Sequence, residues 1–179
     1  MVTFIWGEES MSTLKDLEKR IQVLEDLEAI KKLKAKYGQL CDARYDLQTM
    51  AMKNEAEVDA IARQIANFFS EDGVWDGGEK LGVARGREKI YQRFKESAFQ
   101  FAVHYFVMPD ITIEGNKARA RWYLLQAASL KDNTAVWMSG TEDDDYVKVN
   151  GQWLQTYMKV TLFFLTPYDQ GWAKKRLDK

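Results

Sequence analysis

Cysteine, histidine and proline are scarce in this chain, and their scarcity limits the chemistry available to it. The 179 residues include one cysteine, one histidine and two prolines. A single cysteine cannot form an internal disulfide, which fits a reducing compartment, and we expect the protein in the cytoplasm. One histidine and one cysteine also give no ligand spacing typical of a zinc site, so we expect no metal.

Strong net charge and long hydrophobic runs are missing as well. The formal net charge is −1, so no basic field favours nucleic acid. No run approaches the roughly 18 apolar residues of a membrane span. The first ten residues have a short apolar patch but no basic residues, unlike a signal peptide. We expect residues 1–11 to be a flexible extension and residues 12–179 to form a single domain.

Apolar residues recur at helical spacing in the first half of the chain. We expect helices over residues 13–47 (interrupted near Glu25–Asp26), 58–69 and 87–97. A short strand at residues 74–76 and its hairpin partner at residues 82–86 separate the last two helices.

From residue 101 the apolar period changes to two, as is typical of strands. We expect a strand over residues 101–107, ended by Pro109. Two hairpins follow, one around residues 114–116 and a longer one around Asn150–Gly151, which is a strong two-residue turn signal. Helices followed by long antiparallel strands predict an α+β domain.

Four segments carry a resemblance to a known family: Leu27–Asp42, Gly86–Ile90, His104–Tyr123 and Asp145–Trp153. In this order they resemble SnoaL-like proteins of the nuclear transport factor 2-like superfamily, over residues 14–165. The similarity looks closest to bile acid 7α-dehydratases, with scytalone dehydratase and hexachlorocyclohexane dehydrochlorinase as more distant relatives. The resemblance implies a cone-shaped α+β barrel, with three to four helices packed on a strongly curved, mainly antiparallel sheet around a deep apolar pocket.

The dehydratases of this family use no cofactor and work with a Tyr/Asp/His group in the pocket. The matching residues here are Tyr37, Asp42 and His104. The resemblance therefore implies a cofactor-independent lyase or isomerase acting on a hydrophobic ring-bearing substrate, such as a steroid or polyketide. His104 would be the base, Asp42 would orient it, and Tyr37 would donate a proton or stabilise an oxyanion.

Two positions depart from the bile acid dehydratases. Gln126 stands where they have a functional aspartate, and Leu162 stands where they have an arginine, with Lys159 nearby. We therefore expect a different substrate. Aromatic residues make up 13% of the chain and are suited to lining an apolar pocket. The expected substrate-binding residues are Trp75, Phe106, Trp122, Gln126, Trp137, Lys159 and Leu162.

His104 is also the first candidate on residue chemistry alone, because imidazole transfers protons near neutral pH. A lone histidine on an apolar strand can equally be a packed core residue. Tyr37 and Asp42 are five residues apart on a helix, about 140° of rotation, so they share a pocket only if it wraps around the helix end. The deciding observation is whether His104 bonds Asp42 and faces a cavity.

An alternative function is a non-catalytic small-molecule-binding or oligomerisation module on the same fold. The amphipathic first helix and the apolar strands favour a homodimer or homotrimer. We expect Lys174–Arg176 to be a solvated tail, able to contact a coenzyme A-linked substrate. Cys41 is expected to be buried and unreactive, and Glu142–Asp145 to be an exposed strand segment.

Overall fold

The computed structural model describes residues 13–178. The expected extension at residues 1–11 lies outside this range. The helices and strands are α1 (Leu14–Ala43), β1 (Tyr45–Asp46), β2 (Ala51–Met52), α2 (Glu55–Ala66), β3 (Phe69–Asp76), α3 (Gly78–Leu81), β4 (Val83–Arg85), α4 (Arg87–Lys95), β5 (Phe99–Glu114), β6 (Lys117–Leu130), β7 (Ala135–Val149) and β8 (Gln152–Pro167).

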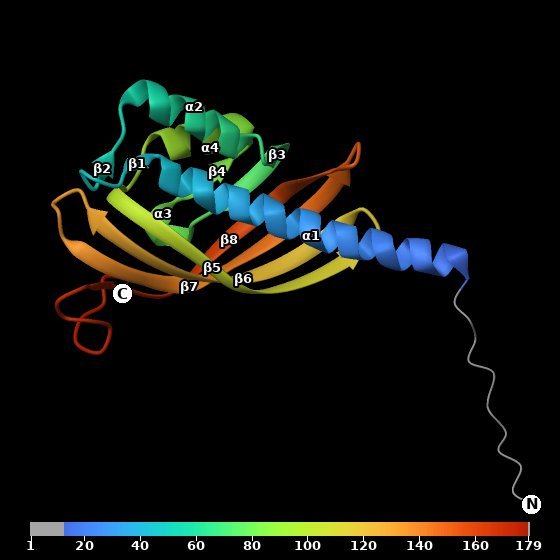
Figure 1. The fold of residues 1–179 in the computed structure, drawn as a ribbon. Coiled ribbons are helices and arrows are strands. Elements are labelled where there is room, and N and C mark those ends of the chain that lie inside the picture. The colour runs from blue at the N-terminus through green and yellow to red at the C-terminus, as the bar shows by residue number, and fades with distance from the viewer. Residues whose placement is uncertain (1–12, 179) are drawn as a thin grey trace, which may run out of the picture.

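A curved six-stranded sheet forms one layer of the molecule, in the order β4-β3-β8-β7-β6-β5. Its neighbours pair antiparallel except β3 and β8, which are parallel. Figure 1 shows α1 lying across the hollow side of the sheet, with α2 and α4 grouped beside it. The expected α+β architecture, helices on a strongly curved and mainly antiparallel sheet, is confirmed.

Helix α1 is continuous, and the interruption expected near Asp26 is wrong. A reciprocal capping box between Thr13 and Asp16 fixes its start. Asp26 does not break the helix, because it points at the sheet and accepts hydrogen bonds from Lys148 Nζ (2.6 Å) and Trp153 Nε1 (2.9 Å). One helix therefore joins the β7–β8 hairpin to the far end of the domain.

Strand β5 continues through Pro109, where the sequence predicted its end. Proline lacks a backbone N–H, but β5 is an edge strand with a neighbour on one side only. The missing N–H therefore leaves no strand on the open side without a hydrogen-bond donor. The register against β6 shifts between Val107 and Asp110, and Met108 has a positive φ of 50°. The proline thus lies at a bulge, and residues 111–113 belong to the same strand.

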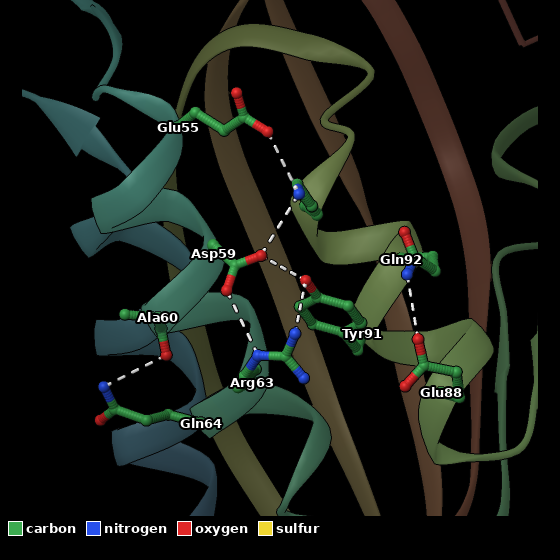
Figure 2. Close-up of polar contacts among 9 residues, drawn as sticks. Glu55, Asp59, Ala60, Arg63, Gln64, Glu88, Tyr91 and Gln92 are labelled. Carbon is green, nitrogen blue, oxygen red and sulfur yellow. Dashed lines mark hydrogen bonds and ion pairs between the residues drawn. The ribbon is translucent and has the colours of Figure 1, made fainter.

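Helices α2 and α4 are joined by polar contacts at their interface (Figure 2). The Tyr91 hydroxyl on α4 donates to the Asp59 carboxylate on α2, and Arg63 donates to that hydroxyl at 3.0 Å. The Arg63 guanidinium also lies 4.1 Å from the centre of the Tyr91 ring. These contacts fix α4, and with it the side chains that α4 turns toward the sheet.

The C-terminal segment folds back onto the sheet through its backbone, while Lys174 and Lys175 are exposed, as expected of a solvated segment. Thr166 Oγ1 donates to the carbonyl of Lys175 (2.6 Å), and the amide of Leu177 donates to the carbonyl of Leu165 (2.6 Å).

No helix within residues 13–178 has the length and apolar character needed to cross a membrane.

Candidate active site

A small cavity of about 50 Å³ lies between α1, α4 and the inner face of the sheet. Helix α1 ends beside it, and β5, β6 and β7 supply the opposite wall. The cavity mixes apolar walls with several polar and charged groups. Its lining includes Tyr37, Cys41, Arg44, Trp75, Leu81, Arg93, Phe94, Phe99, His104, Leu124, Gln126, Met138 and Glu142.

His104 and Asp42 lie within hydrogen-bonding distance of each other at this cavity. Nδ1 of His104 is 2.7 Å from Asp42 Oδ1, and the same oxygen accepts the His104 backbone N–H at 3.1 Å. The imidazole lines the cavity, with 12% of its side chain exposed, while Asp42 lies behind it. A carboxylate at Nδ1 favours the tautomer with the proton on Nδ1, which leaves Nε2 as an acceptor.

A glycine allows the close approach of helix and strand that this pair requires. Gly38 packs against Phe106, and a Cβ at Gly38 would lie 3.2 Å from the Phe106 ring. The Phe106 ring in turn stacks on His104, with centroids 6.0 Å apart. A side chain at position 38 would therefore crowd the Phe106 ring, and that ring would have to shift by a few tenths of an ångström against His104.

Tyr37 lies on the same cavity but does not contact the His104–Asp42 pair. It is buried, and its hydroxyl lies 3.6 Å from Met158 Sδ. Burial raises the pKa of Tyr37 well above its ordinary value, so the phenol stays protonated and able to donate. The helical rotation between Tyr37 and Asp42 is accommodated because Tyr37 faces the cavity and Asp42 stands behind the imidazole.

The remaining residues expected to bind substrate divide into two groups. Trp75 and Gln126 line the cavity, while Phe106 and Leu162 pack beside it in the core. The other three lie elsewhere: Trp122 is buried in a separate apolar cluster, Trp137 packs against Tyr168, and Lys159 is exposed on β8. Alternation along β6 correctly places Trp122 on the inner face, but further along the sheet than the cavity.

Glu142 and Asp144 correct the expectation of an exposed acidic segment. Both are buried on the inner face of β7, and Lys34 of α1 donates to Glu142 Oε2 (2.5 Å) and Asp144 Oδ2 (2.8 Å). Tyr146 donates to the same Asp144 oxygen at 2.7 Å. The period of two along β7 indicates this inward orientation, because it places Glu142 and Asp144 on the same face as the apolar residues Val136 and Met138. That indication was missed in the sequence.

This buried network carries two carboxyl groups against one ammonium. Burial alone would lower the pKa of Lys34, but Asp144 and Glu142 outweigh burial and raise it, so Lys34 stays charged. Burial raises the pKa of Glu142 despite the opposing effect of Lys34, and Asp144 raises it further. Glu142 also lines the cavity, so the Lys34 network borders the same space as His104.

Cys41 and possible metal ligands complete the survey of reactive groups. Cys41 is buried as expected, and burial raises the pKa of its thiol to about 12, which disfavours a thiolate nucleophile. Residues 13–178 contain no group of three or more His, Cys, Asp or Glu side chains arranged to hold a metal ion.

Several solved structures have the same fold as this chain. The type 2 form of hexachlorocyclohexane dehydrochlorinase matches with a TM-score of 0.68 at 16% identity, over 83% of this chain and 92% of that one. A nuclear transport factor 2-like protein with a cystatin-like fold from Novosphingobium aromaticivorans matches with a TM-score of 0.68 at 21% identity, over 92% of this chain and 96% of that one. A proposed scytalone dehydratase from the same species matches with a TM-score of 0.66 at 19% identity, over 87% of this chain and 95% of that one.

These likenesses show that the chain has the cone-shaped α+β fold of nuclear transport factor 2-like proteins. More narrowly, residues 22–159 match the model of the SnoaL-like domain, and the chain belongs to that family. The expected family is confirmed. The closer likeness to bile acid 7α-dehydratases stays a prediction.

Proposed function

We propose that this protein is a cofactor-independent lyase or isomerase that moves protons with His104 and Asp42 on a hydrophobic ring-bearing substrate, such as a steroid or polyketide. The observation that carries the proposal is the 2.7 Å contact between His104 Nδ1 and Asp42 Oδ1 at the wall of a cavity. The SnoaL-like family and the dehydratase and dehydrochlorinase among its structural neighbours support this class of reaction.

The proposed elimination begins at a C–H next to a carbonyl. His104 Nε2 takes the proton, and the electron pair of that C–H bond forms the new C=C bond as the C–O bond breaks. The departing hydroxyl takes a proton from the His104 imidazolium and leaves as water, which returns the imidazole to its neutral form. Asp42 stabilises the imidazolium that forms, and Tyr37 donates a hydrogen bond to the carbonyl oxygen or the departing oxygen.

The test pairs ligand binding with turnover. Wild type is screened by thermal shift against hydroxylated cyclic ketones of steroid, bile-acid and polyketide type, because a ligand of the folded state raises the Tm. Each stabilising compound is then incubated with the protein and checked by mass spectrometry for loss of one water. We expect His104→Gln to slow turnover by about 10²–10⁴-fold and Asp42→Asn by a similar factor.

A matched control is Arg121→Gln, which removes an exposed arginine paired with Asp143 on the outer face of the sheet. It should turn over like wild type. If a compound binds but wild type and His104→Gln leave it equally unchanged, the chain is better described as a non-catalytic binding module. If no compound binds, an oligomerisation module becomes the favoured description.

A further inference from the structure

Two arginines line the cavity without an acidic partner. Arg44 follows the last turn of α1 and Arg93 lies on α4, and both belong to the lining that includes His104. Neither forms a salt bridge with any residue in the range 13–178. Burial and, next, the neighbouring Arg44 lower the pKa of Arg93.

The protein uses few of the hydrogen-bond donors of these arginines. A guanidinium has five N–H donors. Arg44, only 5% exposed, donates from Nε to the carbonyl of Cys41 (3.1 Å) and from Nη1 to that of Phe94 (2.9 Å). Arg93 donates from Nη1 to the carbonyl of Glu96 (3.2 Å), and its buried Nε has no protein partner. Both therefore retain donors for a ligand.

Other groups of the lining point to the same kind of ligand. Trp75 Nε1 and Gln126 Nε2 are also buried without a hydrogen-bond partner. The nearby carboxylates are already engaged, Asp42 with His104 and Glu142 with Lys34. A buried unpaired charge is costly, and an unsatisfied buried donor is costly too. The unused donors of Arg44, Arg93 and Gln126 therefore suit an acceptor-rich anion.

We propose that the substrate carries a carboxylate, which Arg44 and Arg93 bind at the α1–α4 end of the cavity. The cavity of about 50 Å³ is smaller than such a ring, so Leu81, Phe94 and Phe99 must move apart to admit it, with its reacting carbon toward His104. A carboxylate suits the site because it is flat, accepts bidentate hydrogen bonds from a guanidinium and fits a narrow space better than a phosphate does. This inference rests on the proposed function and specifies its substrate class.

The test measures binding in the absence of turnover. Calorimetric titration compares benzoate, cyclohexanecarboxylate and 2-naphthoate with their uncharged amides and with inorganic phosphate. We expect at least one carboxylate to bind at least about tenfold more tightly than its amide, the effect of one charge-assisted pair. Carboxylates that bind no better than their amides would overturn the proposal, as would phosphate binding more tightly than every carboxylate.

Variants separate a binding role from a structural role. Arg93→Met should weaken carboxylate binding at least about tenfold and leave the Tm of the free protein close to that of wild type, because Arg93 is only half-buried and methionine keeps an apolar contact with the Trp75 ring, which lies 4.7 Å from the guanidinium. Arg119→Met, on the exposed outer face of β6, should bind like wild type. A clear fall in Tm with unchanged binding in Arg93→Met would show a structural arginine. Arg44→Met is expected to lose carboxylate binding as well. If Arg44→Met does not fold, the result for Arg93→Met alone decides whether the arginines bind the carboxylate.

A failure here differs from a failure of the proposed chemistry. His104→Gln should keep carboxylate binding while losing turnover. If carboxylates bind through Arg93 and no related hydroxy ketone is converted, the anion site stands and the catalytic proposal falls. If neutral hydroxy ketones are converted and carboxylates do not bind, the catalytic proposal stands and the anion site falls.

Discussion

At the scale of single residues, the site depends on neighbours that the chain holds far apart. Asp42 and His104 are 62 positions apart, yet one carboxylate oxygen holds both the ring and the backbone N–H of the histidine. Two bonds to one oxygen fix the position and the rotation of the imidazole together. The histidine is thus oriented before any ligand arrives.

Cys41 offers a prediction at this scale. Its folded pKa of about 12 leaves roughly one thiol in ten thousand ionised at pH 8. Because the thiolate is the reactive form, the native protein should react with a thiol reagent orders of magnitude more slowly than the protein unfolded in guanidinium chloride. Absorbance at pH 8 follows the reaction of this single cysteine, and rapid stoichiometric labelling of the folded protein would contradict the burial described here.

The residue scale also shows what sequence reasoning missed. Tyr37, Asp42 and His104 were proposed from family resemblance, and the structure brings His104 and Asp42 together. Glu142 was missed because a run of four acidic residues suggests a solvated segment, although strand alternation pointed it inward. Arg44 and Arg93 gave no signal, since neither lies in a motif and helix-end arginines are common.

At the scale of elements, periodicity predicted helices and hairpins well and their ends less well. The Asn150–Gly151 turn and the inner face of β6 were predicted because a two-residue turn and a period of two leave little freedom. The continuation of β5 through Pro109 was not predicted, because it depends on β5 being an edge strand. A strand's place in the sheet order is decided by tertiary packing.

The attachment of α1 to the β7–β8 hairpin gives a pH prediction. Burial would raise the pKa of Asp26, but hydrogen bonds from Lys148 and Trp153 outweigh it and hold the pKa below its ordinary value. A depressed folded pKa stabilises the protein above the unfolded pKa of about 3.9, and this stability is lost as the pH falls through the folded value.

Asp26→Asn should therefore be less stable than wild type at pH 7, and the difference should shrink as the pH falls below about 4. Urea denaturation at a series of pH values measures it. Asp169→Asn, at an exposed position near the C-terminus, is the control and should follow the wild-type curve. A destabilisation by Asp26→Asn that is constant across the acid range would contradict this account.

At the scale of the whole molecule, the buried Lys34 network links α1 to the middle of the sheet. Lys34→Met should destabilise the fold by about 3–5 kcal/mol, because it leaves two buried carboxyl groups without their cation. The triple variant Lys34→Met, Glu142→Met, Asp144→Leu should recover much of that loss. Urea denaturation measures both, and a Lys34→Met variant as stable as wild type would show that the network is not a stabilising link.

Self-association also belongs to this scale. Leu14, Leu17, Ile21 and Leu24 are exposed along α1, and the beginning of the helix extends past the sheet in Figure 1. The expected homodimer or homotrimer stays a prediction, with this stripe as the surface for a second copy. Sedimentation velocity should show wild type associating and Ile21→Lys, Leu24→Lys as a monomer. A wild-type monomer, or an oligomer insensitive to both substitutions, would contradict it.

The most direct test of the central claim is the tautomer of His104. Because the chain has one histidine, protein labelled with ¹⁵N-histidine shows one imidazole in an NMR spectrum. At a pH where the ring is neutral, we predict a proton on Nδ1 and none on Nε2, and Asp42→Ala should abolish that preference. A wild-type ring protonated at Nε2, or an identical spectrum in Asp42→Ala, would show that Asp42 does not prepare His104 as a base.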